Sequence, residues 1–205
     1  ICQQIPDTNI DDIAHTIGLD PRIGNLFLEA GPGYGGSCLP KDMKAIINLS
    51  SKIGVKSTML NAVEKTNRQQ INNIIELIRK NIGKIKGKRI TVLGVAFKPN
   101  TDDIRDSMSI ELIHRLIKSG AVVKIHDPKA LDNARKIFYD NITYTNSISS
   151  ALKNSQCVVI MTKWKEYERI NNKTIKYMNR KFIIDTRRIL SNKNLDAKYY
   201  GIGLG

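Results

Sequence analysis

The feature that most constrains this chain is the alternation of short apolar runs with amphipathic segments in its second half. The runs occupy residues 90–95, 121–125, 157–161 and 182–184 and consist mainly of Ile, Val and other apolar residues. Runs of this length are typical of strands that are buried on both faces, and their alternation with helical segments predicts a parallel sheet. Ligands bind such sheets beyond the carboxyl ends of the strands. We therefore expect an α/β fold whose functional residues follow its strands.

The first half has a helical pattern instead. Its longest apolar stripe repeats at three- and four-residue steps, so it must be buried against this chain or against a partner subunit. A polar, basic stretch at residues 83–88 separates the two patterns. We expect a helical domain over residues 1–85 and an α/β domain over residues 86–205. The expected helices run through Ile13 and Ile17, over residues 41–52, and from about residue 57 to residue 82.

Composition narrows the class of protein. The 205 residues carry a net charge of +14, but Lys and Arg are scattered and aromatic residues make up only 6%, so we expect no nucleic-acid partner. No apolar run is long enough for a membrane span, and the first residues lack the apolar stretch of a signal peptide. Three widely spaced cysteines indicate neither a disulfide framework nor a metal site, so we expect a cytoplasmic protein. Because the chain does not begin with Met, we also expect further sequence upstream.

The residues best suited to take part in a reaction lie in one segment, residues 31–42, with the sequence GPGYGGSCLPKD. Its four glycines let the backbone approach a ligand closely. Cys38 lies at the start of an expected helix, where free N–H groups and partial positive charge favour the thiolate. Lys41 adds a cation and Asp42 a carboxylate, so a nucleophile, a cation and a base fall within five residues. A glycine turn with an inert cysteine explains the same residues, and physical features alone leave both explanations open.

Five segments, taken in order, resemble the UDP-glucose and GDP-mannose dehydrogenase family. The resemblance covers essentially the whole chain and implies a central helical domain that forms a homodimer, followed by a Rossmann-like domain that binds a UDP-sugar. It also implies an NAD-dependent oxidation of a sugar hydroxymethyl group to a carboxylate. The matching segments are Arg22–Asn25, Gly31–Asp42, Val95–Ser107, Ile184–Arg187 and Tyr200–Gly203.

The resemblance assigns catalytic roles within the glycine segment. The Cys38 thiolate would add to an aldehyde to form a thiohemiacetal, and a second oxidation would give a thioester that water hydrolyses. Asp42 would help to activate that water, and Lys41 and Arg105 would contact NAD. Without the resemblance, Lys41 is a solvated lysine, and Asp42 is a carboxylate that stabilises the helix N-terminus.

Substrate contacts are implied in the same way. Arg22 would reach across the dimer to the partner's substrate, although a surface arginine explains it as well. Core packing is the alternative for Phe97, and a surface charge at a strand end is the alternative for Arg187. Asp127 could bind a ribose or simply close the turn in which it lies. The remaining substrate contacts implied are Phe27, Glu29, Ala30, Gly31, Pro32, Gly33, Tyr34, Gly35 and Lys98.

The NAD fingerprint G-x-G-x-x-G is absent, since the first strand ends in Gly94-Val95-Ala96. We therefore expect the NAD-binding domain to lie upstream and this chain to be inactive alone. The sequence Pro-Gly-Tyr directly before Gly-Gly-Ser-Cys favours the UDP-glucose branch of the family over the GDP-mannose branch. Ser37 disfavours the UDP-N-acetylmannosamine branch, which places His there. A non-catalytic module for nucleotide-sugar binding or dimerisation stays open as a different class.

Overall fold

A single sheet of six parallel strands forms the centre of the computed structural model, which describes residues 1–205. The strand order is β3-β2-β1-β4-β5-β6, and every neighbouring pair is parallel. This order reverses direction between β1 and β4, which is where dinucleotide-type folds bind their ligands. The predicted parallel sheet is confirmed. The strands are β1 (Arg89–Leu93), β2 (Val122–His126), β3 (Thr143–Thr145), β4 (Cys157–Ile160), β5 (Phe182–Asp185) and β6 (Lys198–Gly201).

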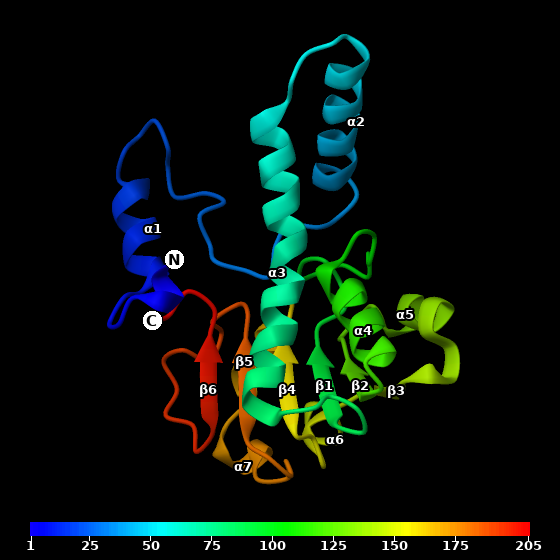
Figure 1. Cartoon of the computed structure of the whole chain (residues 1–205). Helices are drawn as coiled ribbons and strands as arrows, with labels where there is room; N and C mark the ends of the chain where they lie inside the picture. Colours follow the sequence, from blue (N-terminus) through cyan, green and yellow to red (C-terminus); the bar gives the residue numbers. More distant parts are fainter.

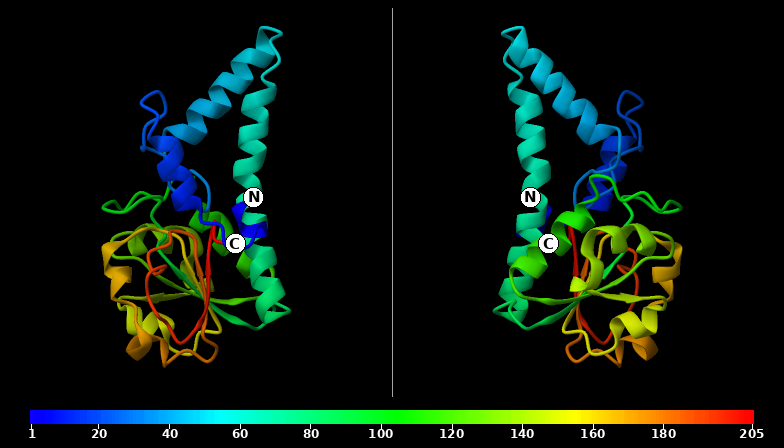
Figure 2. Two further views of the ribbon diagram at one scale, coloured as in Figure 1. Left: turned by 90° about the vertical axis from the view of Figure 1, so that its left-hand side faces the viewer. Right: turned by 90° about the vertical axis from the view of Figure 1, so that its right-hand side faces the viewer.

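The central strands are apolar because both of their faces are covered. All four residues of β4 are buried, and so are the last four of β1. Val92 pairs with Ile125 of β2 on one side and with Val159 of β4 on the other. Helix α3 (Thr58–Ile82) lies along one face of the sheet, and α6 (Ile148–Leu152) and α7 (Asn172–Ile175) lie on the opposite face (Figure 2). Continuous apolar runs rather than alternating ones follow from this two-sided cover.

Helices α1, α2 and α3 lie where the apolar periodicity predicts them. Asn9 caps α1 by accepting a hydrogen bond from the Asp11 amide, and Ser107 caps α4 by accepting one from the Ser109 amide. The helices are η1 (Cys2–Gln4), α1 (Ile10–Gly18), α2 (Leu39–Lys52), α3 (Thr58–Ile82), α4 (Met108–Lys118), α5 (Leu131–Phe138), η2 (Tyr139–Asn141), α6 (Ile148–Leu152), η3 (Lys165–Arg169) and α7 (Asn172–Ile175).

Helix α3 has two different environments along its length. Ile71, Ile74 and Ile78 in its second half are buried in the same core as the strands. Its first half packs beside α2, and the two form a hairpin that projects away from the sheet (Figures 1 and 2). Met59 on this projecting half is 79% exposed. The apolar stripe is therefore buried by this chain only in its second half, and the domain division at residue 85 stays a prediction.

The two ends of the chain meet beside β6 (Figure 1). Asn9 forms an isolated antiparallel bridge with Leu204, and the Gly205 amide donates to the Thr8 carbonyl. Arg188, which follows β5, forms an ion pair of 2.7 Å with Asp11 of α1. These contacts attach the N-terminal helix to the sheet. None of the helices combines the length and the apolar character that crossing a membrane requires.

Candidate functional site

A cavity of about 990 Å³ opens at the carboxyl ends of the strands, beside the point where the strand order reverses. Residues from the 25–35 loop, from the first turn of α2, from the projecting half of α3 and from the loops that follow β1 and β5 form its walls. Arg22, Ala30 and Pro32 do not line it. Of the predicted substrate residues, its walls contain Phe27, Glu29, Gly31, Gly33, Tyr34, Gly35, Phe97, Lys98 and Arg187.

Arg187 brings a positive charge into this cavity. Its Nε donates to the carbonyl of Met161 over 2.9 Å, which turns the guanidinium away from the strand end and toward the glycine loop. A Cβ on Gly31 would lie 2.6 Å from Nη1, so the loop and the guanidinium are in direct contact. Burial lowers the pKa of Arg187, and the charges of Glu29 and Asp185 oppose that shift. Arg187 is a partly buried cation, and Glu29, the anion whose charge opposes the shift most, is itself paired with Lys163 at 2.8 Å. Such a cation suits an anionic ligand.

The loop after β1 supplies a ring and a second cation. Phe97 lies outside the buried core, with its ring against Gly36 and its amide bonded to the carbonyl of Asp103. Lys98 Nζ lies 5.4 Å from the centroid of that ring and is exposed. The core-packing alternative for Phe97 therefore does not hold. Both side chains remain available at the cavity wall.

Residues 31–38, which include the glycines before Cys38, are called the cysteine loop here. Gly35 and Gly36 in this loop must be glycines because another segment of the chain packs against them. A Cβ on Gly35 would lie 2.3 Å from the carbonyl oxygen of Asp106. The Gly36 amide donates to the Arg105 carbonyl over 3.0 Å, and Gly36 has a φ of +92°. The cysteine loop and the 97–107 loop are thus interlocked, and each fixes the position of the other.

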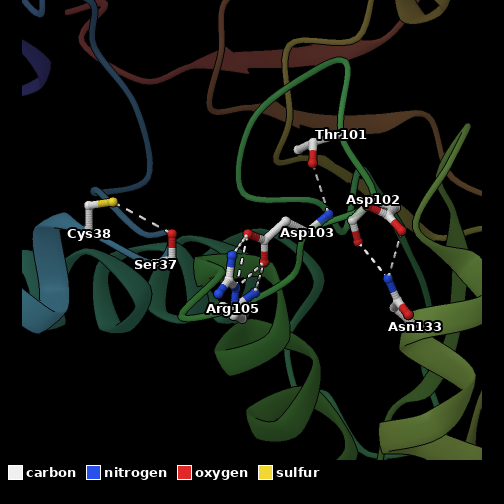
Figure 3. A network of polar contacts seen from close by, with 7 residues as sticks. All are labelled: Ser37, Cys38, Thr101, Asp102, Asp103, Arg105 and Asn133. Atoms are coloured by element: carbon white, nitrogen blue, oxygen red, sulfur yellow. Dashed lines mark hydrogen bonds and ion pairs between the residues drawn. The ribbon is translucent and has the colours of Figure 1, made fainter.

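As predicted, Cys38 lies at the start of a helix: it immediately precedes α2, and it is exposed. Its Sγ lies 3.7 Å from Ser37 Oγ (Figure 3). Cys38 does not line the cavity, but the next residue, Leu39, does. Lys41 and Asp42 are exposed and form an ion pair of 3.5 Å with each other. Cys38, Lys41 and Asp42 therefore lie together at the first turn of α2.

Two of the predicted arginines are held by the aspartate two residues earlier. Arg105 donates to Asp103 through its backbone amide, Nε and Nη2, with the shortest distance 2.6 Å (Figure 3). The side-chain hydrogen bonds to Asp103 are the main cause that raises the pKa of Arg105. Arg22 folds onto Asp20 in the same way, and its side chain is 87% exposed. Arg22 contacts none of the other predicted residues.

Both carboxylate oxygens of Asp127 are occupied by hydrogen bonds within the protein. Its carboxylate accepts hydrogen bonds from the amides of Val95 and Ala96 at the end of β1 and from two amides in its own turn. Trp164 Nε1 donates a further bond of 3.1 Å. Since these bonds occupy both carboxylate oxygens, the turn explanation for Asp127 is the correct one.

Sequence reasoning missed the α3 wall of the cavity. Polar residues on a long helix are typical of a solvated face, so Thr66, Asn67 and Gln70 gave no signal. Asn67 is the most closely engaged of them, because its side chain bonds both backbone groups of Tyr34. Lys163, which follows β4 and pairs with Glu29, was also missed.

Comparison with known proteins decides the family. Residues 1–69 match the central domain of the UDP-glucose/GDP-mannose dehydrogenase family, and residues 91–192 match its UDP binding domain. The chain belongs to this family. Residues 70–90, which include the second half of α3, lie between the two matches, and every residue that lines the cavity except Gln70 falls within one of them.

Named relatives agree with this assignment. A UDP-glucose 6-dehydrogenase of Rickettsia felis is 40% identical over 99% of this chain and 46% of its own length. A UDP-glucose 6-dehydrogenase of Haloferax volcanii is 41% identical over 89% of this chain and 42% of its own length. The structure of a UDP-glucose dehydrogenase from Pyrobaculum islandicum superposes with a TM-score of 0.88 at 32% identity, covering 96% of this chain and 44% of that one. The chain thus spans about half the length of the relatives it matches.

Proposed function

We propose that this chain forms the central and UDP-sugar-binding parts of an NAD-dependent UDP-glucose 6-dehydrogenase. One observation carries the proposal: the cavity at the strand ends places two cations, Lys98 and Arg187, opposite a glycine loop that leads directly to Cys38. The names of the similar relatives support the choice of UDP-glucose. The reaction is the oxidation of UDP-glucose to UDP-glucuronate in two steps.

Binding would use the charges and the backbone of the cavity. Lys98 and Arg187 neutralise the diphosphate, since a desolvated guanidinium binds phosphate oxygens strongly and with defined geometry. Phe97 packs against a ring of the ligand, and Phe27, which is 95% exposed with a φ of +64°, is covered when the site is complete. The loop from Glu29 through Gly35, Ala30 and Pro32 included, follows the sugar nucleotide along its length.

Cys38 would carry the chemistry. The first oxidation removes a hydride and a proton from the sugar C6 hydroxymethyl group and leaves an aldehyde. The Cys38 thiolate adds to that aldehyde as a thiohemiacetal, and the second oxidation leaves a thioester, which is reactive enough to hydrolyse. Asp42, one turn further along α2, helps to activate the water. Hydrolysis releases the carboxylate and restores the thiol.

NAD would serve as the hydride acceptor for both oxidations. The sheet of this chain does not offer a glycine cradle for it, because the space beside Gly94 is filled: a Cβ there would lie 2.5 Å from the Thr162 side chain. Lys41 and Arg105 fit a different contribution, because both are exposed cations that can contact an anionic cofactor held mainly by another part of the enzyme. Lys41 follows Cys38 by three residues, and the Arg105 carbonyl accepts a hydrogen bond from Gly36 in the loop that leads to Cys38. The main NAD-binding domain is therefore proposed to lie upstream of this chain.

The projecting hairpin would form a homodimer. Leu49, Ile53 and Met59 on α2 and α3 are each more than half exposed, and an apolar surface of this kind favours a partner. Arg22 is free of this chain's own cavity, which is consistent with a contact to the partner's substrate. A helical domain over residues 1–85, a nucleotide-sugar domain over residues 86–205 and a cytoplasmic location complete the proposal.

Calorimetric titration of this chain with UDP-glucose and with GDP-mannose tests the substrate. We expect UDP-glucose to bind more tightly, and tighter binding of GDP-mannose would contradict the assignment. In the complete enzyme, Cys38→Ser should lower turnover by about a thousandfold or more while UDP-glucose affinity stays nearly unchanged. Retained turnover in that variant would refute the nucleophile.

A further inference from the structure

Asn67 has an unusual position for an asparagine in a helix. It lies in the middle of α3, where asparagine is a poor helix former and no helix end needs a cap. Asn61 and Asn81 on the same helix bond back to the carbonyl four residues earlier, as solvent-side asparagines commonly do. Asn67 instead reaches the cysteine loop, 33 residues away in sequence.

The contact is a two-point clamp on a single residue. The Tyr34 amide donates to Asn67 Oδ1 over 2.8 Å, and Asn67 Nδ2 donates to the Tyr34 carbonyl over 3.0 Å. Neither backbone group of Tyr34 makes another hydrogen bond within the protein. A Cβ on Gly33 would lie 2.5 Å from Asn67 Oδ1, so the amide also explains why residue 33 is glycine. The Asn67 side chain therefore satisfies both backbone groups of Tyr34, as a neighbouring strand satisfies the backbone groups of a sheet edge.

The tyrosine side chain is fixed by the same helix. Its hydroxyl donates to Glu64 over 3.1 Å, and Glu64, whose side chain is 15% exposed, also accepts a bond from Arg68. Burial raises the pKa of Tyr34, and the bond to Glu64 adds to that shift. The whole residue, backbone and ring, is thus held by one face of α3.

Tyr34 and Asn67 separate two cavities. Both residues line the 990 Å³ cavity proposed for the sugar nucleotide, and both line a second cavity of about 640 Å³. Arg105, proposed to contact the cofactor, lines only the second one. We infer that Asn67 is a positioning residue, which holds Tyr34 as the partition between the nucleotide-sugar cavity and the cavity beside Arg105. This inference rests on the proposed function for the identity of the ligand, but not for the clamp itself.

Two measurements on this chain test the inference: calorimetric binding of UDP, and hydrogen exchange resolved at the Tyr34 amide. Asn67→Ala should weaken UDP binding by about tenfold and accelerate exchange at Tyr34, while exchange in β1 stays slow. Asn67→Asp keeps the acceptor but places an oxygen against the Tyr34 carbonyl. It should weaken UDP binding as well, with the Tyr34 amide still protected. The matched control is Asn73→Ala, an exposed asparagine on the same helix that lines neither cavity, and it should change neither quantity.

The outcomes separate this inference from the proposed function. If the unaltered chain binds UDP and Asn67→Ala binds it equally well, the positioning role is refuted while the function stands. If the unaltered chain does not bind UDP, the ligand assignment fails, and hydrogen exchange at the Tyr34 amide alone tests the clamp. Unchanged exchange at Tyr34 in Asn67→Ala then overturns the clamp, and accelerated exchange supports it. Should Asn67→Ala fail to fold, Asn67→Asp gives the affinity comparison.

Discussion

Replacing Gly35 with alanine would force the two interlocked loops apart. The new Cβ would lie 2.3 Å from the Asp106 carbonyl oxygen and 3.4 Å from the Cα of Ser107. An ordinary carbon–oxygen contact is about 3.4 Å, so the loops must separate by about 1 Å. Gly35 does not have a positive φ, which means that the entire cost arises from this contact and none from the backbone conformation.

The magnitude follows from the type of contact. Because the obstacle is backbone rather than a flexible side chain, we expect Gly35→Ala to cost about 1–3 kcal/mol of stability. A cavity wall displaced by about 1 Å should also lower UDP affinity by about tenfold or more. Urea denaturation gives the first quantity and calorimetric titration with UDP gives the second.

Gly54→Ala is the control for this variant. Gly54 has a φ of +75° and nothing within 4 Å of its would-be Cβ, so its substitution carries only the cost of the left-handed conformation, about 1 kcal/mol. It should leave UDP affinity unchanged. If Gly35→Ala retained both wild-type stability and wild-type UDP affinity, the idea that the two loops fix each other would be wrong.

Two further predictions follow from the site and the core. Arg187→Lys keeps the charge but loses the Nε bond to Met161, so UDP affinity should fall by about tenfold. The control Arg180→Lys, at an exposed position, should not change UDP affinity. Equal UDP affinities for the two variants would count against a role for the guanidinium. Burial lowers the pKa of His126, so the folded state favours the neutral ring. The stability that the neutral His126 ring contributes is present above the unfolded-state pKa of about 6.5. It is lost as the pH falls through the lower pKa of the folded state. Thermal melting should show Tm falling between about pH 7 and pH 5, and His126→Gln should reduce that fall; an equal fall in the variant would assign it to other groups.

The central part of the fold was predictable because it is apolar on both sides. β1, β2, β4 and β5 are each covered by helices, and burial leaves an apolar run in the sequence. β3 and β6 lie at the two edges of the sheet, and their sequences, Thr-Tyr-Thr and Lys-Tyr-Tyr-Gly, lack such a run. Only their pairing partners identify them as strands, and pairing over long sequence distances is not a local signal.

The candidate site was predictable where it follows strand ends. Phe97, Lys98 and Arg187 converge because the carboxyl ends of parallel strands meet at one edge of the sheet. The α3 wall was not predictable, since its polar residues resemble a solvated helix face until the loop that covers them is in place. Arg22 lies outside the cavity, and its role depends on a partner that the sequence cannot place.

Helix α3 behaves mechanically as a beam fixed at one end. Its 25 residues correspond to a length of about 37 Å. The end that carries Ile71 to Ile82 is embedded in the core, whereas the end that carries Met59 stands clear of it. Asn67 lies just above the point of embedding, where a tilt of the free end produces the least displacement. The cavity wall is therefore built on the part of the beam that moves least, and whatever binds the free end acts through a long lever arm.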